Sequence, residues 1–566
     1  MTDATLRIGR VVEVTGSRVR AELLSNVEEL YRSYRSRRYT VGQIGSLVRI
    51  EVGDALVFCS VTALRMQEDE ANSKAGDAVR DVKWLDLDLL GEGTRTGLGS
   101  TDFEFRRGVS TYPLPGQFVY IATAAELSRI YSIPDEPSIP VGTITQTANL
   151  PLHLRIDELL GKHFAVLGTT GSGKSCAVAG LVHSIAGGYQ HGHIIVLDLH
   201  NEYKTCFGEL GVSFDPTTLC LPHWLLTLEE TFDLFVGKTE FVATSQMNIL
   251  KDALIAARQA FKEYPPDFEV TPDTPIPYTL KALMGHIEKN KPEQASKQES
   301  HLKILNKIKV LQSDSRLRFL VTEDGDVSDN LTDIVSTILR APTAGKPISI
   351  VDLSGVPSDV LDVVVSVLSR LIFSFAVWSP ADQRMPVLII CEEAHRYVPR
   401  GGGAAFSAAR EGLERIAKEG RKYGVGLGLI SQRPAELSET VLSQCNSIIA
   451  LRIANEADQA FVKRAFPDST RNMVDALSSL RTQEALIVGE AVAVPTRFRF
   501  TNLPLHRRPH SNNPVFSECW SKDQYGLNFV NAVIESWRRQ RRTKERLTLA
   551  GLDNTIRASA LTPTFA

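Results

Sequence analysis

Residues 168–175, Gly-Thr-Thr-Gly-Ser-Gly-Lys-Ser, carry the strongest chemical signal in the chain, because they match the pattern G-x-x-x-x-G-K-[ST] in full. Glycines in such a loop let the backbone wrap closely around an anion, with N–H groups and the start of the next helix directed at phosphate oxygens. We expect Lys174 to neutralise the β and γ phosphates of ATP and the Ser175 hydroxyl to bind Mg²⁺. The predicted nucleotide-binding residues are Gly168, Thr169, Thr170, Gly171, Ser172, Gly173, Lys174, Ser175 and Cys176.

A pair of acids follows the apolar run 386–391. That run is typical of a central strand, and Glu392 and Glu393 stand at its carboxyl end, where the ligands of open α/β sheets gather. We expect Glu392 to hold Mg²⁺ through water, although many proteins with this loop have aspartate there, and Glu393 to polarise the attacking water. The alternative is a pair of solvated acids without a catalytic part.

Two polar residues flank the apolar strand predicted over 425–430. Gln432 stands just past its end, where an amide can sense the γ-phosphate and orient water. Arg421 stands just before it and is a candidate arginine finger, reaching across a subunit boundary to stabilise charge in the transition state. A surface salt bridge explains the position of Arg421 equally well.

Three further segments are open to two interpretations each. Residues 198–203 (Asp-Leu-His-Asn-Glu-Tyr) follow a predicted strand and are either catalytic support or a helix N-cap. Residues 396–403 form a basic, glycine-rich loop that suits either the lining of a DNA channel or a mobile linker. Residues 31–39 interleave arginines with tyrosines; they contact nucleic acid or a neighbouring subunit, or form a solvated loop, which we favour.

Strands and helices alternate around the predicted site, which indicates a parallel sheet covered by helices. The strand runs are 163–167, 193–199, 347–353, 387–391, 425–430, 447–451 and 485–488, and a helix is predicted over 174–186. Between 222 and 340 the strands stop, and helical periodicity over 280–289 and 300–311 predicts a helical insertion. Near the N-terminus, short alternating runs over 6–14, 18–23, 46–51, 56–62 and 118–123 predict a small β-barrel.

The chain therefore divides into five predicted segments. These are a β-barrel over 1–150, the first part of the core over 151–221, a helical insertion over 222–345, the second part of the core over 346–502 and an extension over 503–566. The extension includes an amphipathic helix over 524–546 with a basic end, which suits a structural brace better than a phosphate contact.

Composition places the chain among ordinary globular proteins, with 43% hydrophobic and 23% charged residues. The net charge is −3, so binding of nucleic acid would require local basic surface. Seven cysteines without CxxC spacing fit free thiols in a reducing compartment. No signal peptide is visible, and the apolar stretch 363–378 contains Arg370 and is too short to span a membrane, so we predict a buried helix, a cytoplasmic protein and no membrane partner.

The motifs together resemble the HerA family of bacterial and archaeal DNA translocases, which is related to FtsK within the RecA-like motors. The resemblance rests on GTTGSGKS (168–175), LDLHNEY (197–203), CEEAHRYVP (391–399) and EGRKYGVGLGLISQRP (419–434), and LSQCNSIIALRIAN (442–455) and VGEAVAVPTRFRF (488–500) extend it. It covers the sheet domain and, more loosely, the barrel, which is similar to the family's HAS-barrel. The implied fold class is α/β, with a RecA-like P-loop NTPase core, an N-terminal small β-barrel and a helical insertion.

The resemblance also implies a homo-oligomer, a hexameric ring that threads double-stranded DNA through its centre, with ATP sites between subunits. Such rings pair with a nuclease-type or sirtuin-like effector, in DNA end processing or antiphage defence. The family roles carried over by position fall on Lys174, Glu392, Glu393, Gln432 and, as the finger in trans, Arg421.

Lys162 departs from the family, which often has an arginine acting in cis at that position. The function we favour is ATP-driven translocation on DNA together with a nuclease-type effector. The alternative is a nucleotide-dependent scaffold ring that assembles and activates an effector without moving along DNA. A kinase acting on a small molecule is disfavoured, because the two glutamates together with Gln432 suit hydrolysis with γ-phosphate sensing.

Overall fold

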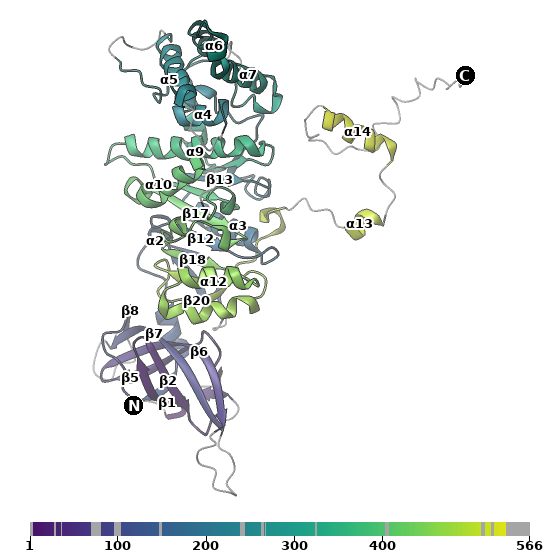
Figure 1. The fold of residues 1–566 in the computed structure, drawn as a ribbon. Coiled ribbons are helices and arrows are strands. Elements are labelled where there is room, and N and C mark those ends of the chain that lie inside the picture. Colours follow the sequence, from purple (N-terminus) through teal and green to yellow (C-terminus); the bar gives the residue numbers. More distant parts are fainter. Residues whose placement is uncertain are drawn as a thin grey trace. The chain divides into compact units, whose positions relative to one another are not determined.

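The structure is a computed structural model, which describes residues 4–27, 30–34, 37–68, 81–95, 103–145, 150–237, 244–261, 265, 268–322, 325, 327–401, 407–510, 516–521 and 526–538. The chain forms two compact units, Met1–His510 and Ser511–Ala566. The first unit contains the barrel, the large sheet and the insertion (Figure 1).

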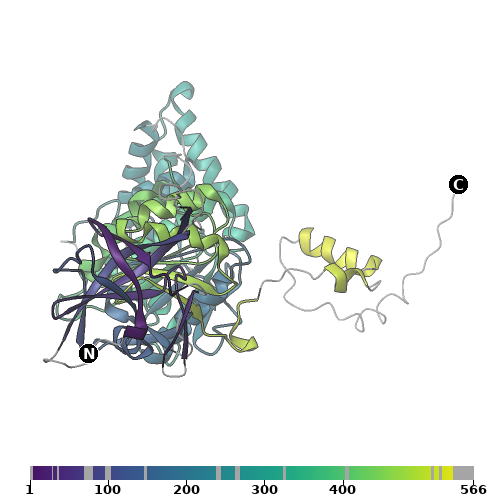
Figure 2. The ribbon, with the colours of Figure 1, turned by 90° about the horizontal axis from the view of Figure 1, so that it is seen from below.

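The N-terminal strands close into a barrel, as the alternating runs predicted. The seven-stranded sheet has the order β2-β1-β9-β5-β6-β7-β8, and a further pairing of β2 with β7 closes six of these strands into a ring. Figure 2, turned by 90° from Figure 1, shows these strands in purple. The strands are β1 (Arg7–Thr15), β2 (Arg18–Leu23), β5 (Leu47–Val52), β6 (Ala55–Glu68), β7 (Asp81–Arg95), β8 (Phe103–Arg107) and β9 (Phe118–Ile121).

The arginine- and tyrosine-rich segment 31–39 forms a hairpin of β3 (Tyr31–Tyr34) and β4 (Arg37–Thr40). Arg38 lies 3.6 Å above the centre of the Tyr31 ring, a cation–π contact. Arg32 donates to the Asn26 carbonyl oxygen at 2.8 Å. In the described part of this segment, Arg32 and Arg38 therefore contact neighbouring residues of the N-terminal part of the chain.

The core is an eleven-stranded sheet with the order β11-β10-β20-β19-β18-β12-β17-β16-β13-β15-β14. From β18 to β14 neighbouring strands run parallel, as predicted, while β19, β20, β10 and β11 pair antiparallel. Short connections, such as the one between β19 and β20, permit only antiparallel pairing. The strands are β10 (Ser138–Ile144), β11 (Pro151–Arg155), β12 (Phe164–Leu167), β13 (Ile194–Asp198), β14 (Gly211–Phe214), β15 (Ile348–Asp352), β16 (Val387–Cys391), β17 (Val425–Ser431), β18 (Ser447–Ala450), β19 (Glu484–Gly489) and β20 (Thr496–Phe500).

The core extends beyond the predicted segment boundaries at both ends. Strand β10 belongs to it although it lies before residue 150. Past residue 503 the chain returns to the core, where the His510 N–H donates to the Glu202 carbonyl oxygen at 3.3 Å. The first compact unit thus includes residues 503–510.

Each parallel strand buries both of its faces, which explains the continuous apolar runs in the sequence. In β12, Ala165 and Leu167 belong to one hydrophobic cluster, while Phe164 and Val166 belong to the other. Helix α3 (Lys174–Gly188) covers the second face, and α9 (Ser358–Trp378) and α10 (Ser407–Tyr423) cover the first (Figure 1). The P-loop helix and the helices after β15 and β16 therefore lie on opposite sides of the sheet.

The helical insertion packs on the outer side of α9 (Figure 1). Its helices are α4 (Leu228–Phe235), α5 (Thr244–Gln259), α6 (Leu280–Lys289), α7 (Glu299–Ser313) and α8 (Leu331–Leu339). The buried guanidinium of Arg258 donates to backbone carbonyl oxygens of Leu226, at 2.9 Å, and Trp224, at 3.3 Å. Burial lowers the pKa of Arg258, and these carbonyls compensate for its desolvation.

Helix α9 is apolar enough over Val360–Trp378, with a mean hydropathy of 2.1, to match a membrane span by length and composition, but 72% of that stretch is buried inside the protein. Within it, the Arg370 guanidinium forms an ion pair with the buried Glu230 carboxylate of α4 at 2.8 Å. Glu230 also accepts from the Ser366 hydroxyl at 2.8 Å and caps α4 through the Thr227 N–H. This confirms the predicted buried helix and shows that Arg370 connects it to the insertion.

The second unit contains α13 (Phe516–Trp520) and α14 (Leu527–Arg538). Helix α14 lies inside the predicted amphipathic segment 524–546, whose residues 539–546 lie outside the described part of the chain.

We predict that Glu230→Ala lowers the free energy of unfolding by about 2 kcal/mol, because it leaves the partly buried Arg370 without its carboxylate and removes the cap of α4. Urea unfolding followed by tryptophan fluorescence measures the change. Glu229→Ala is the matched control, since this exposed neighbour lies in the same turn and should shift stability by less than about 0.5 kcal/mol. Equal losses in both variants would contradict the assigned role of Glu230.

Candidate active site

The carboxyl ends of four parallel strands lie side by side and bring the predicted residues together. In the register of the sheet, Leu167 of β12 pairs with Ser431 of β17, Leu429 of β17 with Cys391 of β16, and Cys391 with Leu197 of β13. The residues that follow these strands are the P-loop, Gln432, the two glutamates and Asp198. Strand β17 lies between the P-loop strand and the acidic strand.

The loop 168–173 has the backbone conformation that its glycines predict. Gly171 has φ 77° and Gly173 φ 90°, a region that residues with side chains rarely adopt. A Cβ atom at Gly173 would come within 3.0 Å of the Gln483 side chain, whereas one at Gly171 would meet open space. The loop therefore turns tightly against the core, and α3 begins at Lys174.

Arg452, which follows β18, supports the loop from the other side. Its carbonyl oxygen accepts from the N–H and the Oγ1 of Thr169, both at 3.0 Å, and its guanidinium donates to the Gly171 carbonyl oxygen at 3.3 Å. Arg452 was not among the predicted site residues. Its position just past the strand predicted over 447–451 is the signal that could have identified it.

Lys174 and Glu393 meet directly across the pocket. The Lys174 Nζ lies 3.0 Å from the Glu393 Oε1, and the two residues are only 7% and 4% exposed. Glu393 adopts the left-handed backbone conformation with φ 49°, which a side chain of this size adopts only under constraint from its surroundings. The turn after β16 thus directs the carboxylate toward the P-loop lysine.

Glu392 faces β13, where it meets two residues of the segment 198–203. The Tyr203 hydroxyl donates to the Glu392 Oε1 at 3.1 Å, and all of Glu392, Tyr203 and Asp198 are buried. Asp198 accepts the backbone N–H groups of His200, Glu202 and Tyr203 at 3.0 to 3.3 Å. The segment forms a tight turn and not a helix N-cap, and Tyr203 is a site residue that the motif alone did not single out.

The electrostatics of this acidic group follow from burial. Burial raises the pKa of Glu392 well above its usual range, and the neighbouring Asp198 raises it further, while Lys174 acts in the opposite direction. Burial also raises the pKa of Asp198, although the three N–H donors oppose that shift. A divalent cation would stabilise the charged form of both carboxylates.

Gln432 contacts the P-loop itself. Its Oε1 accepts from the Thr170 hydroxyl at 2.5 Å, which places the amide at the mouth of the loop. The preceding Ser431 is fully buried, and its hydroxyl lies 3.2 Å from the Nδ1 of His395. Gln432, the residue after β17, therefore lies beside the P-loop.

Arg421 and Lys162 lie at the opposite edge of the sheet from the pocket of their own chain. Arg421 is exposed in the last turn of α10, before β17 begins, and the seven residues of β17 span roughly 20 Å. Lys162 precedes β12 and forms ion pairs with Glu158 and Glu490. Neither residue reaches the P-loop of its own chain.

The structure also gives the positions of Cys176 and of the first part of the basic loop 396–403. Cys176 lies in the first turn of α3, half-buried, and burial raises its pKa. The basic loop begins with a short 3₁₀ turn, Ala394–Arg396, and Arg400 pairs with Glu439 at 2.9 Å. Gly402 and Gly403 lie outside the described residues.

The residues present fit ATP and Mg²⁺. Three buried side-chain oxygens around the P-loop, Ser172 Oγ, Glu392 Oε2 and Glu393 Oε2, make no hydrogen bond within the described part of the chain. Carboxylate and hydroxyl oxygens are the ligands that Mg²⁺ takes together with phosphates and water. Ser175 and Glu392 are the residues that would hold the ion.

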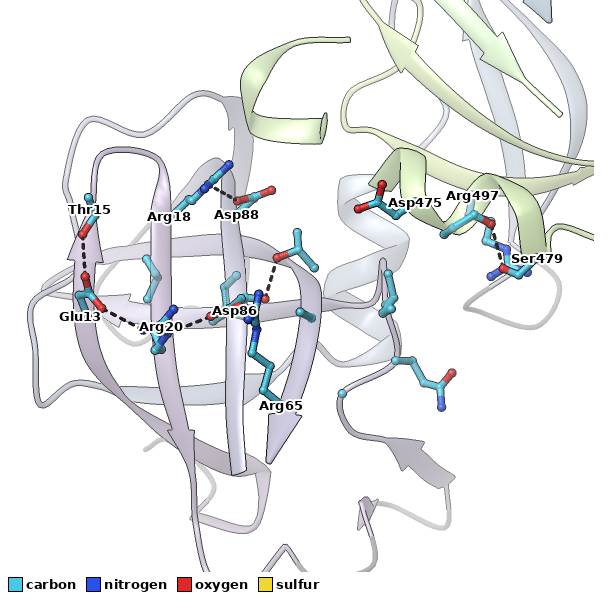
Figure 3. A pocket seen from close by; sticks show the side chains of 18 residues that line it. Glu13, Thr15, Arg18, Arg20, Arg65, Asp86, Asp88, Asp475, Ser479 and Arg497 are labelled. Atoms are coloured by element: carbon cyan, nitrogen blue, oxygen red, sulfur yellow. Dashed lines mark hydrogen bonds and ion pairs between the residues drawn. The ribbon is translucent and has the colours of Figure 1, made fainter. Parts of the chain in front are cut away.

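A hollow with a volume of about 880 Å³ lies elsewhere, between the barrel and residues 475–497 of the core (Figure 3). Its charged side chains compensate one another: Arg20 contacts Asp86 at 3.0 Å and Glu13 at 3.4 Å, and Arg65 contacts Asp86 at 2.9 Å. A hollow whose arginines are neutralised in this way is a poor site for a triphosphate. The nucleotide chemistry belongs to the P-loop.

Fold and site together define a P-loop NTPase: a parallel sheet whose carboxyl edge carries a phosphate-binding loop, an acidic pair and a polar residue on the strand between them. Residues 139–372 match the family model of the central domain of helicase HerA. The resemblance seen in the motifs is confirmed.

The chain is also similar to curated proteins and to a solved structure. The DNA double-strand break repair helicase HerA of Pyrococcus furiosus is 28% identical over 472 residues, covering 75% of this chain and 78% of that protein. The protein of the same name from Sulfolobus acidocaldarius is 26% identical over 441 residues, covering 75% and 80%. The structure of VirB4 of Thermoanaerobacter pseudethanolicus has a TM-score of 0.47 and 18% identity, covering 66% of this chain and 100% of VirB4.

We predict that Glu392→Gln raises the thermal unfolding midpoint by about 1 to 4 °C at pH 8 without nucleotide or metal. The folded-state pKa of Glu392 is raised, so the folded state holds this proton more tightly than the unfolded state does, and ionisation of the group lowers stability as pH rises. Glutamine keeps the acceptor for Tyr203 without the charge. Scanning calorimetry should show a smaller gain at pH 5.5.

Glu411→Gln, at an exposed position of α10, serves as the control and should leave the midpoint unchanged at both pH values. A lower midpoint for Glu392→Gln at pH 8 would mean that the carboxylate stabilises the fold.

Proposed function

We propose that the chain is an ATP-driven translocase on double-stranded DNA of the HerA type, which acts as a cytoplasmic hexameric ring and works with a nuclease-type or sirtuin-like effector. The observation that supports the hydrolysis step is the 3.0 Å contact of Lys174 with Glu393, beside the contact of Gln432 with Thr170. The named function of the curated relatives, DNA double-strand break repair helicase, supports DNA as the track.

Binding of ATP changes the partner of Lys174. In the structure the lysine neutralises Glu393, which is buried and has few alternatives. Triphosphate oxygens at the P-loop compete for this cation and draw it away from the carboxylate. Glu393 then has a free oxygen with which to accept a proton from water, so nucleotide binding activates the base.

The remaining residues of the pocket bind and orient. Backbone N–H groups of 168–173 and the start of α3 hold the phosphates, and Gln432 exchanges its contact with Thr170 for the γ-phosphate or the attacking water. Ser175 and Glu392 would hold Mg²⁺, which would neutralise phosphate charge. Tyr203 orients Glu392 through the 3.1 Å hydrogen bond.

The ring is proposed because Arg421, a candidate phosphate ligand, lies away from the pocket of its own chain. Arg421 is exposed at the amino edge of the sheet, where it can face the carboxyl edge of a neighbouring copy. An arginine supplied in trans stabilises the charge of the transferring phosphoryl group. The insertion and the C-terminal extension are the proposed docking regions for an effector.

We predict that Lys174→Ala and Glu393→Gln each lower ATP turnover by about a hundredfold or more, because positioning and electrostatics supply most of the catalysis of phosphoryl transfer. Steady-state phosphate release with and without duplex DNA, and with the product of an adjacent gene, measures this. Glu411→Gln should retain wild-type turnover. Near-normal turnover in either site variant would overturn the assignment of the pocket.

The same measurement separates translocation from a scaffold role. Turnover that rises with the length of duplex DNA supports movement along it, whereas turnover that rises only with the partner protein supports a nucleotide-dependent scaffold. If neither duplex DNA nor the partner protein changes ATP turnover, the proposed coupling is contradicted.

We predict that Arg421→Ala and Lys174→Ala subunits, each inactive alone, regain turnover when mixed. A Lys174→Ala subunit still offers Arg421 to the intact pocket of an Arg421→Ala neighbour, so mixed interfaces are complete. Activity should exceed the sum of the separate variants by about tenfold. Lys418→Ala on the exposed side of α10 is the control and should stay near wild type. Absence of complementation would contradict a finger acting in trans.

A further inference from the structure

Two segments that the proposed hydrolysis does not use form the side of the P-loop that faces away from the acidic pair. Strand β12, which leads into the loop, pairs with β17 on one side and with β18 on the other, and β19 lies beyond β18. Arg452 follows β18, and Gln483 directly precedes β19. Because β19 runs antiparallel to β18, both residues lie at the edge of the sheet that carries the pocket.

The direction of a bound triphosphate follows from the two sides of the loop. P-loop N–H groups cradle the α and β phosphates, and the lysine reaches the β and γ phosphates. Lys174 contacts Glu393 past β16, and Thr170 contacts Gln432 past β17, so the γ end belongs on the side of these two strands. On that assignment, the nucleoside at the other end of the phosphates extends toward β18 and β19.

Arg452 is attached to the first half of the loop. Its carbonyl oxygen accepts two hydrogen bonds from Thr169, and its guanidinium donates to the Gly171 carbonyl oxygen at 3.3 Å. Within the described part of the chain no carboxylate pairs with this guanidinium, which is partly exposed. A hydrogen bond in the plane of a guanidinium leaves its faces open, and such faces stack on aromatic rings. Arg452 therefore offers a flat, charged surface at the rim of the loop.

Gln483 is held against the second half of the loop in a strained conformation. Its φ is 66°, in the left-handed region that a side chain of this length rarely adopts. Its N–H donates to the Ser172 carbonyl oxygen at 2.9 Å, and its carbonyl oxygen accepts the Phe500 N–H at 3.0 Å. Its Cγ lies 3.0 Å from the point where a Cβ atom of Gly173 would stand. These backbone bonds secure the residue, while its half-buried side-chain amide makes no hydrogen bond within the described residues.

An amide and a guanidinium at this place suit a nucleobase. A glutamine amide presents one donor and one acceptor, the pattern that complements N6 and N7 of adenine, whereas guanine presents two acceptors at the same edge. Bases also stack on planar side chains, and arginine adds a cation–π contribution. Backbone strain of the kind seen at Gln483 gathers where a ligand is held, because the surrounding structure must maintain it.

We propose that Arg452 and Gln483 form the base site of the nucleotide pocket, in which the Gln483 amide pairs with adenine and the Arg452 guanidinium packs on its face, so that the chain selects ATP over GTP. The inference rests on the proposed ATP hydrolysis and names the residues that select its substrate. It also gives the strained turn before β19 a role, since this turn carries the amide over the loop.

We predict that Gln483→Gly weakens binding of a non-hydrolysable ATP analogue by about tenfold and that of the matching GTP analogue by less than about twofold, because it removes neutral hydrogen bonds to adenine. Glycine adopts φ 66° without strain, so the turn keeps its backbone. Inorganic tripolyphosphate, which has no base, should bind wild type and variant within about twofold of each other. Isothermal titration calorimetry on the full chain with Mg²⁺ measures all three.

Two further variants and a control test the direction of the selection. Gln483→Arg should prefer the GTP analogue, because arginine matches the two acceptors of guanine. Arg452→Ala should weaken the ATP analogue by about tenfold and tripolyphosphate by less than about threefold, since stacking on the base is lost. Gln444→Ala, at an exposed glutamine before β18, is the control and should bind all three probes as wild type does. Thermal unfolding midpoints verify that each variant is folded.

Equal losses of both analogues and tripolyphosphate in Gln483→Gly would mean that Gln483 only supports the loop. Unchanged binding of the ATP analogue, or an unchanged ATP-to-GTP preference in Gln483→Arg, would mean that the amide does not read the base. Each of these results overturns the base site. A failure of the proposed function is distinct, because the wild-type chain would then bind neither the analogues nor tripolyphosphate.

Discussion

The buried ion pair between Lys174 and Glu393 is the contact on which the rest of the site depends. A lysine on the first turn of α3 and a glutamate past β16 can meet at 3.0 Å only if β12, β17 and β16 end at the same level. Neither charge is stable in this environment without the other, because desolvation penalises each one alone. Asp198 and Glu392 are buried beside the pair, so carboxylates outnumber the lysine in this part of the pocket. A pocket with this surplus of acid favours a ligand that brings its own cations, as a metal-bound nucleotide does.

The register of the sheet is in turn secured by what covers it. Each strand sends alternate side chains into two separate hydrophobic clusters, so a slip by one residue would exchange the faces of every strand at once. Helices α9 and α10 bury one face, and the insertion is attached to α9 by the Arg370–Glu230 pair. The part of the chain farthest from the chemistry therefore contributes to the alignment of the strand ends that carry it.

Much of the site could be predicted from the sequence, because local pattern determines it. The P-loop, the acidic pair and Gln432 each stand at the end of an apolar run, and parallel strands bring such ends together. Tyr203 and His395 could not be predicted as partners, because their contacts join segments that are 189 and 36 residues apart. Strands β10, β11 and β20 at one edge of the sheet, and β7 and β8 of the barrel, were not predicted, because pairing across the sheet defines them.

The position of Arg421 limits which nucleotide this residue can contact. Its chemistry is that of a phosphate ligand, and its helix ends at the amino edge of the sheet, whereas the pocket lies at the carboxyl edge beyond the seven residues of β17. Lys162 lies at the same amino edge and is held by Glu158 and Glu490. No rotation of a side chain covers the roughly 20 Å between these edges. If Arg421 acts on a nucleotide, it acts on one bound to another copy, and hydrolysis in one subunit then reports directly on the contact with the next. A motor that must act in sequence around a ring requires that coupling, and in this fold it follows from the direction in which the parallel strands run.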